Sequence, residues 1–225
     1  MLAVAVRALV RGLLEPLCLA CEAPLPLEAG DGLCPACAEA WPPLPPRSRL
    51  PGVDPVLACW DYAGTARALV VRAKEERGGP ALPLLRARLA RRWLLGGCEP
   101  GGIAAVPPSR RRRRAGFHLA EDLARSLRRA SGWPEGCRLR RLVERPDQAG
   151  LDGRARRRNL AGTFRARPRR GEPPDRLWLV DDVLTTGATL AEAARAARAA
   201  GVRRVGALCL CRVPAPPARE RPGRA

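Results

Sequence analysis

Residues 177–190, which read LWLVDDVLTTGATL, decide the fold of this chain. Four apolar residues predict a buried strand over 177–180, two aspartates mark its end, and a short Thr/Gly loop leads into an Ala-rich helix predicted over 190–200. A helix N-terminus has unpaired N–H groups and the positive end of the helix dipole, so it favours a phosphate. Gly187 lets a phosphate approach the backbone, and the threonine hydroxyls add donors. The stretch therefore predicts a phosphate-binding loop.

The two carboxylates complement this loop, because Asp181 and Asp182 stand where a sugar held by its phosphate would place its hydroxyl groups. A phosphate loop beside a carboxylate pair fits a 5-phosphorylated ribose. The alternative is an ordinary strand–helix turn in a doubly wound sheet. Such a turn needs neither the paired carboxylates nor the three threonines that follow them, so we favour a ligand site.

The same stretch resembles the binding motif of the type I phosphoribosyltransferases, which use 5-phosphoribosyl 1-pyrophosphate (PRPP). The resemblance implies that Asp181 and Asp182 are catalytic. It implies that PRPP is bound by Asp181, Asp182, Thr185, Thr186, Gly187, Ala188 and Thr189. It also implies Mg²⁺ as a cofactor and a transition state with oxocarbenium character, for which catalysis is mainly positioning and electrostatics.

A second loop between a predicted strand and a predicted helix carries five consecutive arginines, residues 110–114. The guanidinium fork matches two oxygens of a pyrophosphate at once, so this loop is a second candidate anion site. For any one of these arginines, a solvated basic surface is the alternative. Lys74 is the only lysine among 41 lysines and arginines. It suggests that a compact ammonium is needed at the pyrophosphate, although an exposed helix lysine explains it equally well.

Two Cys-x-x-Cys pairs lie near the N-terminus, with twelve residues between them: Cys18, Cys21, Cys34 and Cys37. This spacing predicts a zinc ribbon, since Zn²⁺ takes four thiolates in a tetrahedron and a closed Cys₄ site is structural. Two disulfides in a secreted protein are the alternative, which the lack of an export signal disfavours. The other cysteines are expected to be small core residues: Cys59, Cys98, Cys137, Cys209 and Cys211.

In its two anion loops and its four N-terminal cysteines, the chain resembles the ComF (competence protein F) family, also described as amidophosphoribosyltransferase-like. Members combine an N-terminal Cys₄ zinc ribbon with a type I phosphoribosyltransferase domain. The resemblance assigns a pyrophosphate loop to Pro107, Arg110, Arg114 and Gly116, with Lys74 beside it. It assigns a flexible loop to Gln148, Arg156 and Asn159. Gly116 and Phe117 match the family's Arg-Gly-Phe-Asn-Gln, whereas Ala115, His118 and Leu119 depart from it.

Hydrophobic periodicity and breakers divide the chain into an N-terminal helix with the ribbon (1–45), a phosphoribosyltransferase-like domain (56–212) and a disordered tail (213–225). Residues 41–55 are proline-rich and predict a linker, and residues 144–159 predict a mobile loop. Strands are predicted over 56–62, 103–106, 139–143, 163–165, 177–180 and 202–211. Helices are predicted over 64–77, 82–95, 116–130 and 190–200. Alternating strands and helices predict an α/β fold with a parallel sheet.

The net charge of +19 points by itself to a polyanionic partner. However, the preference for arginine over lysine looks like the codon bias of a GC-rich genome, so we expect only weak nucleic-acid binding. Aromatic residues are 4% of the chain, which disfavours base stacking as a main function. Three hypotheses remain: a PRPP-dependent transferase with an unknown acceptor, a non-catalytic PRPP-binding regulator, and a nucleic-acid adaptor that handles single-stranded DNA during uptake with its zinc ribbon and basic surface. DNA-uptake proteins are expected as possible partners. The opening apolar run is too short and charged to span a membrane, so a cytoplasmic location is expected.

Overall fold

A five-stranded sheet with the strand order β1-β2-β7-β6-β3 organises the fold. The computed structural model describes residues 16–25, 32–42, 44–109, 113–114, 116–143 and 160–214. The strands of the sheet are β1 (Ser48–Leu50), β2 (Val53–Asp61), β7 (Arg204–Arg212), β6 (Arg176–Leu184) and β3 (Gly102–Ala105). The edge strand β1 runs antiparallel to β2, and every other neighbouring pair is parallel. This mixed α/β sheet confirms the predicted fold class.

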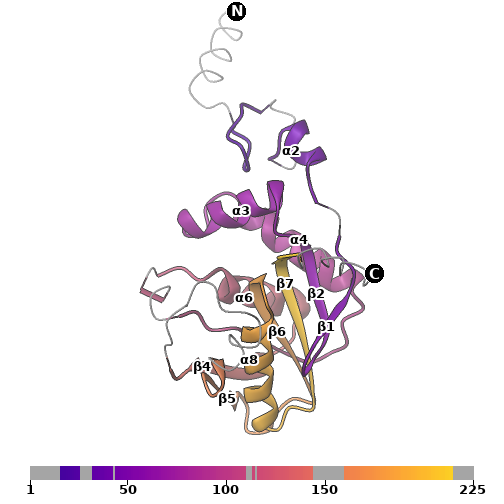
Figure 1. The fold of residues 1–225 in the computed structure, drawn as a ribbon, viewed down its shortest axis with the longest axis vertical. Coiled ribbons are helices and arrows are strands. Elements are labelled where there is room, and N and C mark those ends of the chain that lie inside the picture. Colours follow the sequence, from indigo (N-terminus) through magenta and orange to yellow (C-terminus); the bar gives the residue numbers. More distant parts are fainter. Residues whose placement is uncertain are drawn as a thin grey trace, which may run out of the picture.

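Helices cover both faces of the sheet (Figure 1). One core joins the sheet to three helices through side chains such as Leu69, Leu85 and Leu123. These helices are α3 (Gly64–Glu75), α4 (Leu82–Leu95) and α6 (Leu119–Ser131). The other core lies under α8 (Ala188–Ala199), whose buried alanines allow close packing on the strands. The sheet is therefore buried on both faces, as expected for parallel strands.

A two-stranded antiparallel sheet, β4 (Cys137–Arg141) with β5 (Phe164–Pro168), packs into the core beneath α8. The prediction that its strands belong to the parallel sheet is wrong. Both strands alternate buried and exposed residues, so each presents one apolar face to the core and one face to solvent. That alternation is the mark of an antiparallel ladder with one wet face.

The N-terminal cysteine region lies over α3, at the opposite end of the molecule from β4 and β5 (Figure 1). Its described residues include the short helix α2 (Pro35–Glu39). Cys18, Leu25 and Leu33 are buried in the same apolar cluster as the helices of the main domain. The region is therefore packed onto α3 rather than hanging from a linker.

Several predicted boundaries are corrected by the structure. The predicted linker 41–55 contains β1 and the start of β2, and Pro55 is tolerated because pairing of β2 with β7 begins only at Val56. Strand β6 does not end at the aspartates but continues to Leu184. Helix α6 begins at Leu119 because Gly116 has φ +84°, outside the helical region. Helix α8 begins at Ala188 rather than at 190, and the helix predicted over 82–95 has the bounds of α4.

Some predictions fall on parts of the chain that the structure does not describe. The N-terminal helix, the loop over 144–159 and most of the C-terminal tail lie outside the described residues. Within the described part, no helix has the length and apolar character that crossing a membrane requires. Of the five cysteines expected in the core, four are buried, while Cys98 is half-buried.

Candidate functional site

The two predicted anion loops leave the sheet side by side, because β3 and β6 are parallel neighbours. Ala105 lies opposite Val180, and the Val106 N–H donates to the Val180 carbonyl at 2.9 Å. Beyond this point β3 has ended, while β6 still pairs with β7 through Asp181 and Leu184. The two aspartates therefore lie at a step in the sheet, next to the loop that follows β3. Ligands of open α/β sheets bind at such carboxyl ends of strands.

Lys74 and Asp182 form the clearest interaction at this step. The lysine Nζ lies 2.7 Å from Asp182 Oδ2, and the Asp182 side chain is only 14% exposed. Helix α3 supplies this lysine from its last turn. The structure thus brings the single lysine of the chain to the aspartate pair.

The aspartate pair is held by its own backbone. The Asp182 N–H donates to Asp181 Oδ1 at 2.9 Å, and the Val183 N–H donates to Asp182 Oδ1 at 2.7 Å. Burial, and then the negative charge of Asp182, raise the pKa of Asp181 well above its usual range. A carboxyl group perturbed by burial and a like charge, at the end of a parallel strand, is typical of a functional site.

We expect Asp181→Asn to stabilise the ligand-free protein at neutral pH, because the amide removes a charge that burial disfavours. An unfolded aspartate ionises near pH 3.9, so native Asp181 lowers stability as the pH rises from there towards its raised pKa. The variant should lack this loss. Its unfolding midpoint near pH 7 should rise by roughly 2–4 °C, the shift that about 1 kcal/mol produces in a chain of this size.

Thermal unfolding followed by circular dichroism measures this effect. Asp175→Asn is the control, because Asp175 is a half-exposed carboxylate that pairs with Arg204 at 2.6 Å, at the other end of β6. The control should leave the midpoint unchanged or lower it slightly. An equal or lower midpoint for Asp181→Asn would show that the Asp181 charge is well compensated in the native state.

The threonine loop joins β6 to α8 as the sequence predicts. Gly187 is the residue before the first helical turn, with φ +74°, and the Ala188 N–H reaches Thr186 Oγ1 at 3.4 Å. Thr185 is exposed, and Thr189 is half-buried. The first-turn N–H groups of α8 lack intrahelical acceptors, as in every α-helix. The loop therefore offers backbone N–H groups and hydroxyls on the same side as the aspartates.

A second structural constraint, which the sequence did not reveal, requires glycine at position 187. A Cβ atom at this position would lie 2.6 Å from Leu50 Cδ1, in strand β1. The positive φ and this contact both require glycine, whether or not a ligand is present. Leu50 was missed because it lies in the proline-rich segment that predicted a linker.

The structure describes only part of the predicted pyrophosphate loop. Pro107 is buried, whereas Arg114 and Gly116 are exposed. The Arg113 N–H donates to the Ser109 carbonyl at 2.8 Å. Arg110 lies outside the described residues, as do the three flexible-loop residues Gln148, Arg156 and Asn159.

Glu192 in α8 is a buried, hydrogen-bonded residue that sequence reasoning missed. It is 7% exposed, accepts the Gly162 N–H at 2.8 Å and forms a double hydrogen bond with Arg195, both at 2.8 Å. Glu192 therefore fixes the backbone at Gly162, just before β5. Its only sequence signal is a lone acidic residue in an alanine-rich helix.

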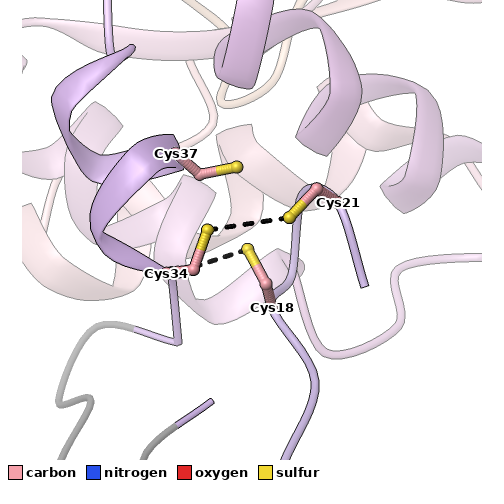
Figure 2. A group of neighbouring side chains, drawn as sticks. All are labelled: Cys18, Cys21, Cys34 and Cys37. Atoms are coloured by element: carbon pink, nitrogen blue, oxygen red, sulfur yellow. Dashed lines mark hydrogen bonds between the residues drawn. The ribbon is translucent and has the colours of Figure 1, made fainter. Parts of the chain in front are cut away.

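The four N-terminal cysteines come together as predicted (Figure 2). Their sulfur atoms all lie within 4.8 Å of one another, and none of the cysteines forms a disulfide. Cys21 Sγ and Cys34 Sγ are 3.6 Å apart, and the Cys34 N–H lies 3.3 Å from Cys18 Sγ. Four sulfurs bound to one zinc at 2.3 Å would be about 3.8 Å apart, so the cluster can hold a metal such as zinc.

The pKa values of the four thiols also favour binding of a cation. Burial alone would raise the pKa of Cys18, but backbone N–H groups, that of Cys34 foremost, lower it to about 6. Burial and the neighbouring thiols raise the pKa of Cys37 to about 12. Four thiolates this close cannot all ionise without a positive charge between them, and a coordinated metal supplies that charge.

Helix α3 links the cysteine cluster to the aspartate pair. Thr65 Oγ1 in its first turn donates to the Cys37 carbonyl at 2.8 Å, and Arg72 forms an ion pair with Glu22 at 3.2 Å. Both contacts tie α3 to the cysteine region. The same helix carries Lys74, so the position of this lysine depends on how the N-terminal region is packed.

Comparison with known proteins places this geometry in a family. The model of the phosphoribosyl transferase domain family matches residues 113–223. The DNA utilization protein YhgH of Salmonella typhimurium is 33% identical over 224 residues, covering 87% of this chain and 96% of the relative. YhgH of Escherichia coli K12 is 32% identical over 225 residues, with the same coverage. Competence protein F of Haemophilus influenzae is 36% identical over 112 residues, covering 47% of this chain and 48% of the relative.

These matches agree with the two features found in the structure. The α/β domain carries an acidic pair before a threonine loop, and a cluster of four cysteines able to bind a metal precedes it. The chain therefore belongs to the ComF family, together with the DNA utilization protein YhgH and competence protein F.

Proposed function

We propose that this chain binds PRPP with Mg²⁺ and transfers its 5-phosphoribosyl group to an acceptor. The observation that carries the proposal is the half-buried pair Asp181 and Asp182, held at a step of the sheet where Lys74 contacts Asp182 and the loop to α8 follows. The phosphoribosyl transferase domain match supports PRPP as the ligand.

The proposed roles follow from chemistry and position. Asp181 and Asp182 accept hydrogen bonds from the ribose hydroxyls, and the loop from Thr185 to Thr189 binds the 5-phosphate. The loop after β3, with Pro107, Arg114 and Gly116, binds the pyrophosphate. Mg²⁺ would neutralise charge on the pyrophosphate leaving group, for which oxygen-rich carboxylate and phosphate surroundings are suited. The protein's contribution is to position the ribose and to stabilise developing charge.

Lys74 neutralises Asp182 in the ligand-free chain and can exchange that partner for pyrophosphate oxygens. We expect Lys74→Met to weaken Mg²⁺-PRPP binding about tenfold, because one charge-assisted hydrogen bond to a phosphate is lost. Lys74→Arg should keep most of the affinity. Calorimetry with Mg²⁺-PRPP measures both variants, and wild-type affinity in Lys74→Met would place the lysine outside the ligand site.

Turnover separates the enzyme from a PRPP-binding regulator, since both share the same site. Protein, Mg²⁺ and PRPP are incubated with pools of bases, amines and nucleosides, and pyrophosphate release is followed. Acceptor-dependent release supports the transferase. PRPP binding without release in any pool supports the regulator, while failure to bind PRPP contradicts both.

The names of the relatives add a biological setting. YhgH is called a DNA utilization protein, and the Haemophilus influenzae relative is called a competence protein. We infer that this chain also acts in DNA utilization, with PRPP as its small-molecule ligand and other proteins of DNA uptake as its partners.

A further inference from the structure

The outer face of the β4–β5 sheet carries only arginine in its central part. In β4, Arg138 and Arg140 are exposed, Cys137 and Leu139 are buried, and Arg141 at the strand end is half-buried. In β5, Arg165 and Arg167 are exposed in the same alternation. Because side chains alternate along a strand, all four guanidinium groups leave the same face of the small sheet. We call these four residues the arginine face.

The register sets like charges directly against each other. Arg138 lies opposite Arg167, and Arg140 lies opposite Arg165. Like charges in directly opposed positions destabilise a sheet. Within the described part of the chain, none of the four has a carboxylate partner, whereas Arg86, Arg204 and Arg212 each form an ion pair at 2.9 Å or less. A bias towards arginine codons accounts for many arginines but not for this uncompensated placement.

The arginine face is hollowed. A cavity of about 210 Å³ is lined by the four arginines with Pro168 and Arg169. A second hollow of about 510 Å³ shares Arg165 and Arg167 but lies towards α8, where its lining is mostly apolar and includes Phe164. Arginines two residues apart on a strand are spaced by about 6.8 Å, comparable with the distance between successive phosphates of an extended nucleic-acid strand. The face thus offers two rows of cations with a groove between them.

We propose that the arginine face binds the phosphate backbone of a single nucleic-acid strand. No aromatic side chain lies among the four arginines, and Phe164 of β5 points into the core, so the contact reads backbone charge and not base sequence. Hot spots of protein–protein interfaces combine arginine with tryptophan and tyrosine, whereas this face offers arginine alone. The surface is separate from the aspartate pair and goes beyond the proposed PRPP function.

The test reverses one row of charge without harming the fold. In Arg138→Glu with Arg140→Glu, each glutamate faces an arginine across the ladder, so the small sheet gains two ion pairs and the unfolding midpoint should stay equal or rise. The probe is a fluorescently labelled 20-nucleotide single-stranded DNA of mixed sequence. Anisotropy at about 0.1 M salt should show at least tenfold weaker binding. The slope of log K against log salt should fall by about 3, because the two replaced arginines and the two opposed arginines that the glutamates neutralise each lose a phosphate contact, which contributes about 0.7.

The matched control is Arg125→Glu with Arg129→Glu, which makes the same change in net charge on exposed positions of α6. Helix α6 belongs to the core on the other face of the central sheet. The control should lose no more than about threefold in affinity. Equal losses in the two double variants, or wild-type binding by Arg138→Glu with Arg140→Glu, would overturn the proposal.

Two further measurements fix the partner and separate this proposal from the PRPP site. Unlabelled single-stranded DNA should displace the probe, while poly-glutamate at equal charge should do so at least tenfold less well; equal competition would overturn a nucleic-acid partner. Calorimetry should give wild-type affinity for Mg²⁺-PRPP in Arg138→Glu with Arg140→Glu. Loss of PRPP binding there would contradict the separateness of the two surfaces, while the PRPP proposal is tested by other variants.

Discussion

A chain carrying Asp181→Ala and Asp182→Ala is expected to bind Mg²⁺-PRPP about 10² to 10⁴ times more weakly than the wild-type chain. Each carboxylate is proposed to accept a hydrogen bond from a ribose hydroxyl, and a hydrogen bond with a charged partner contributes about 1.5–3 kcal/mol. Two such bonds amount to about 3–6 kcal/mol, and each 1.4 kcal/mol changes affinity tenfold. Calorimetry with Mg²⁺-PRPP measures the loss directly.

The change should not unfold the chain, because it removes two adjacent, half-buried carboxylates that repel each other. Lys74 loses its partner in this variant but is 34% exposed along its side chain and can be solvated. Circular dichroism should therefore show a wild-type fold. The matched control, Glu172→Ala with Asp175→Ala, removes two carboxylates just before β6, at the other end of the strand. It should keep wild-type affinity. Equal affinity in the two double variants would refute the assignment of the ribose site.

The pH dependence of Mg²⁺-PRPP affinity gives an independent check of the ribose site. Because burial and Asp182 raise the pKa of Asp181, the ligand-free site holds a proton at pH values where a solvent-exposed aspartate does not. An ionised Asp181 accepts ribose hydrogen bonds more strongly, so affinity for Mg²⁺-PRPP should increase as the pH rises through this pKa. Asp181→Asn should remove that dependence.

The parts of the fold that the sequence predicts well are those with strong local signals. Three segments carry such a signal, and the structure forms each as predicted: the apolar run before Asp181, the alanine-rich helix α8 and the amphipathic helix α4. The cysteine spacing predicts the cluster because four ligands in two short turns have few other uses. The α/β architecture follows from the alternation of these elements.

The parts that the sequence does not predict depend on contacts between distant residues. Strand β1 was hidden by prolines, although its Leu50 packs on Gly187. The pairing of β4 with β5 was not predicted, because the arginines that alternate with the buried residues of both strands lower the hydrophobic signal. The ion pair of Lys74 with Asp182 joins α3 to β6, and only the packed sheet brings these elements together.

We expect the purified protein to contain one zinc per chain, held by Cys18, Cys21, Cys34 and Cys37. Structural zinc sites in small domains bind with apparent free energies of about 10–16 kcal/mol at neutral pH, comparable with the whole stability of a typical domain. Metal analysis measures the content. Zinc should be lost in Cys37→Ser but kept in Cys98→Ser, which changes a half-buried cysteine outside the cluster. Absence of zinc, or oxidised thiols in a reducing preparation, would contradict the assignment.

Loss of the metal should reach further than the cysteines, because α3 is tied to them. In Cys37→Ser the central sheet should stay folded, as its strands pair without the N-terminal region. Amide hydrogen exchange should nevertheless accelerate in α3, which loses the Thr65 contact to the Cys37 carbonyl and the Arg72 pair with Glu22. Since α3 positions Lys74, affinity for Mg²⁺-PRPP should fall about as far as in Lys74→Met. Unchanged exchange in α3 after zinc loss would show that the cysteine region and the ligand site are independent. Faster exchange with a matching loss of affinity would make the zinc cluster a support for the site rather than a separate module.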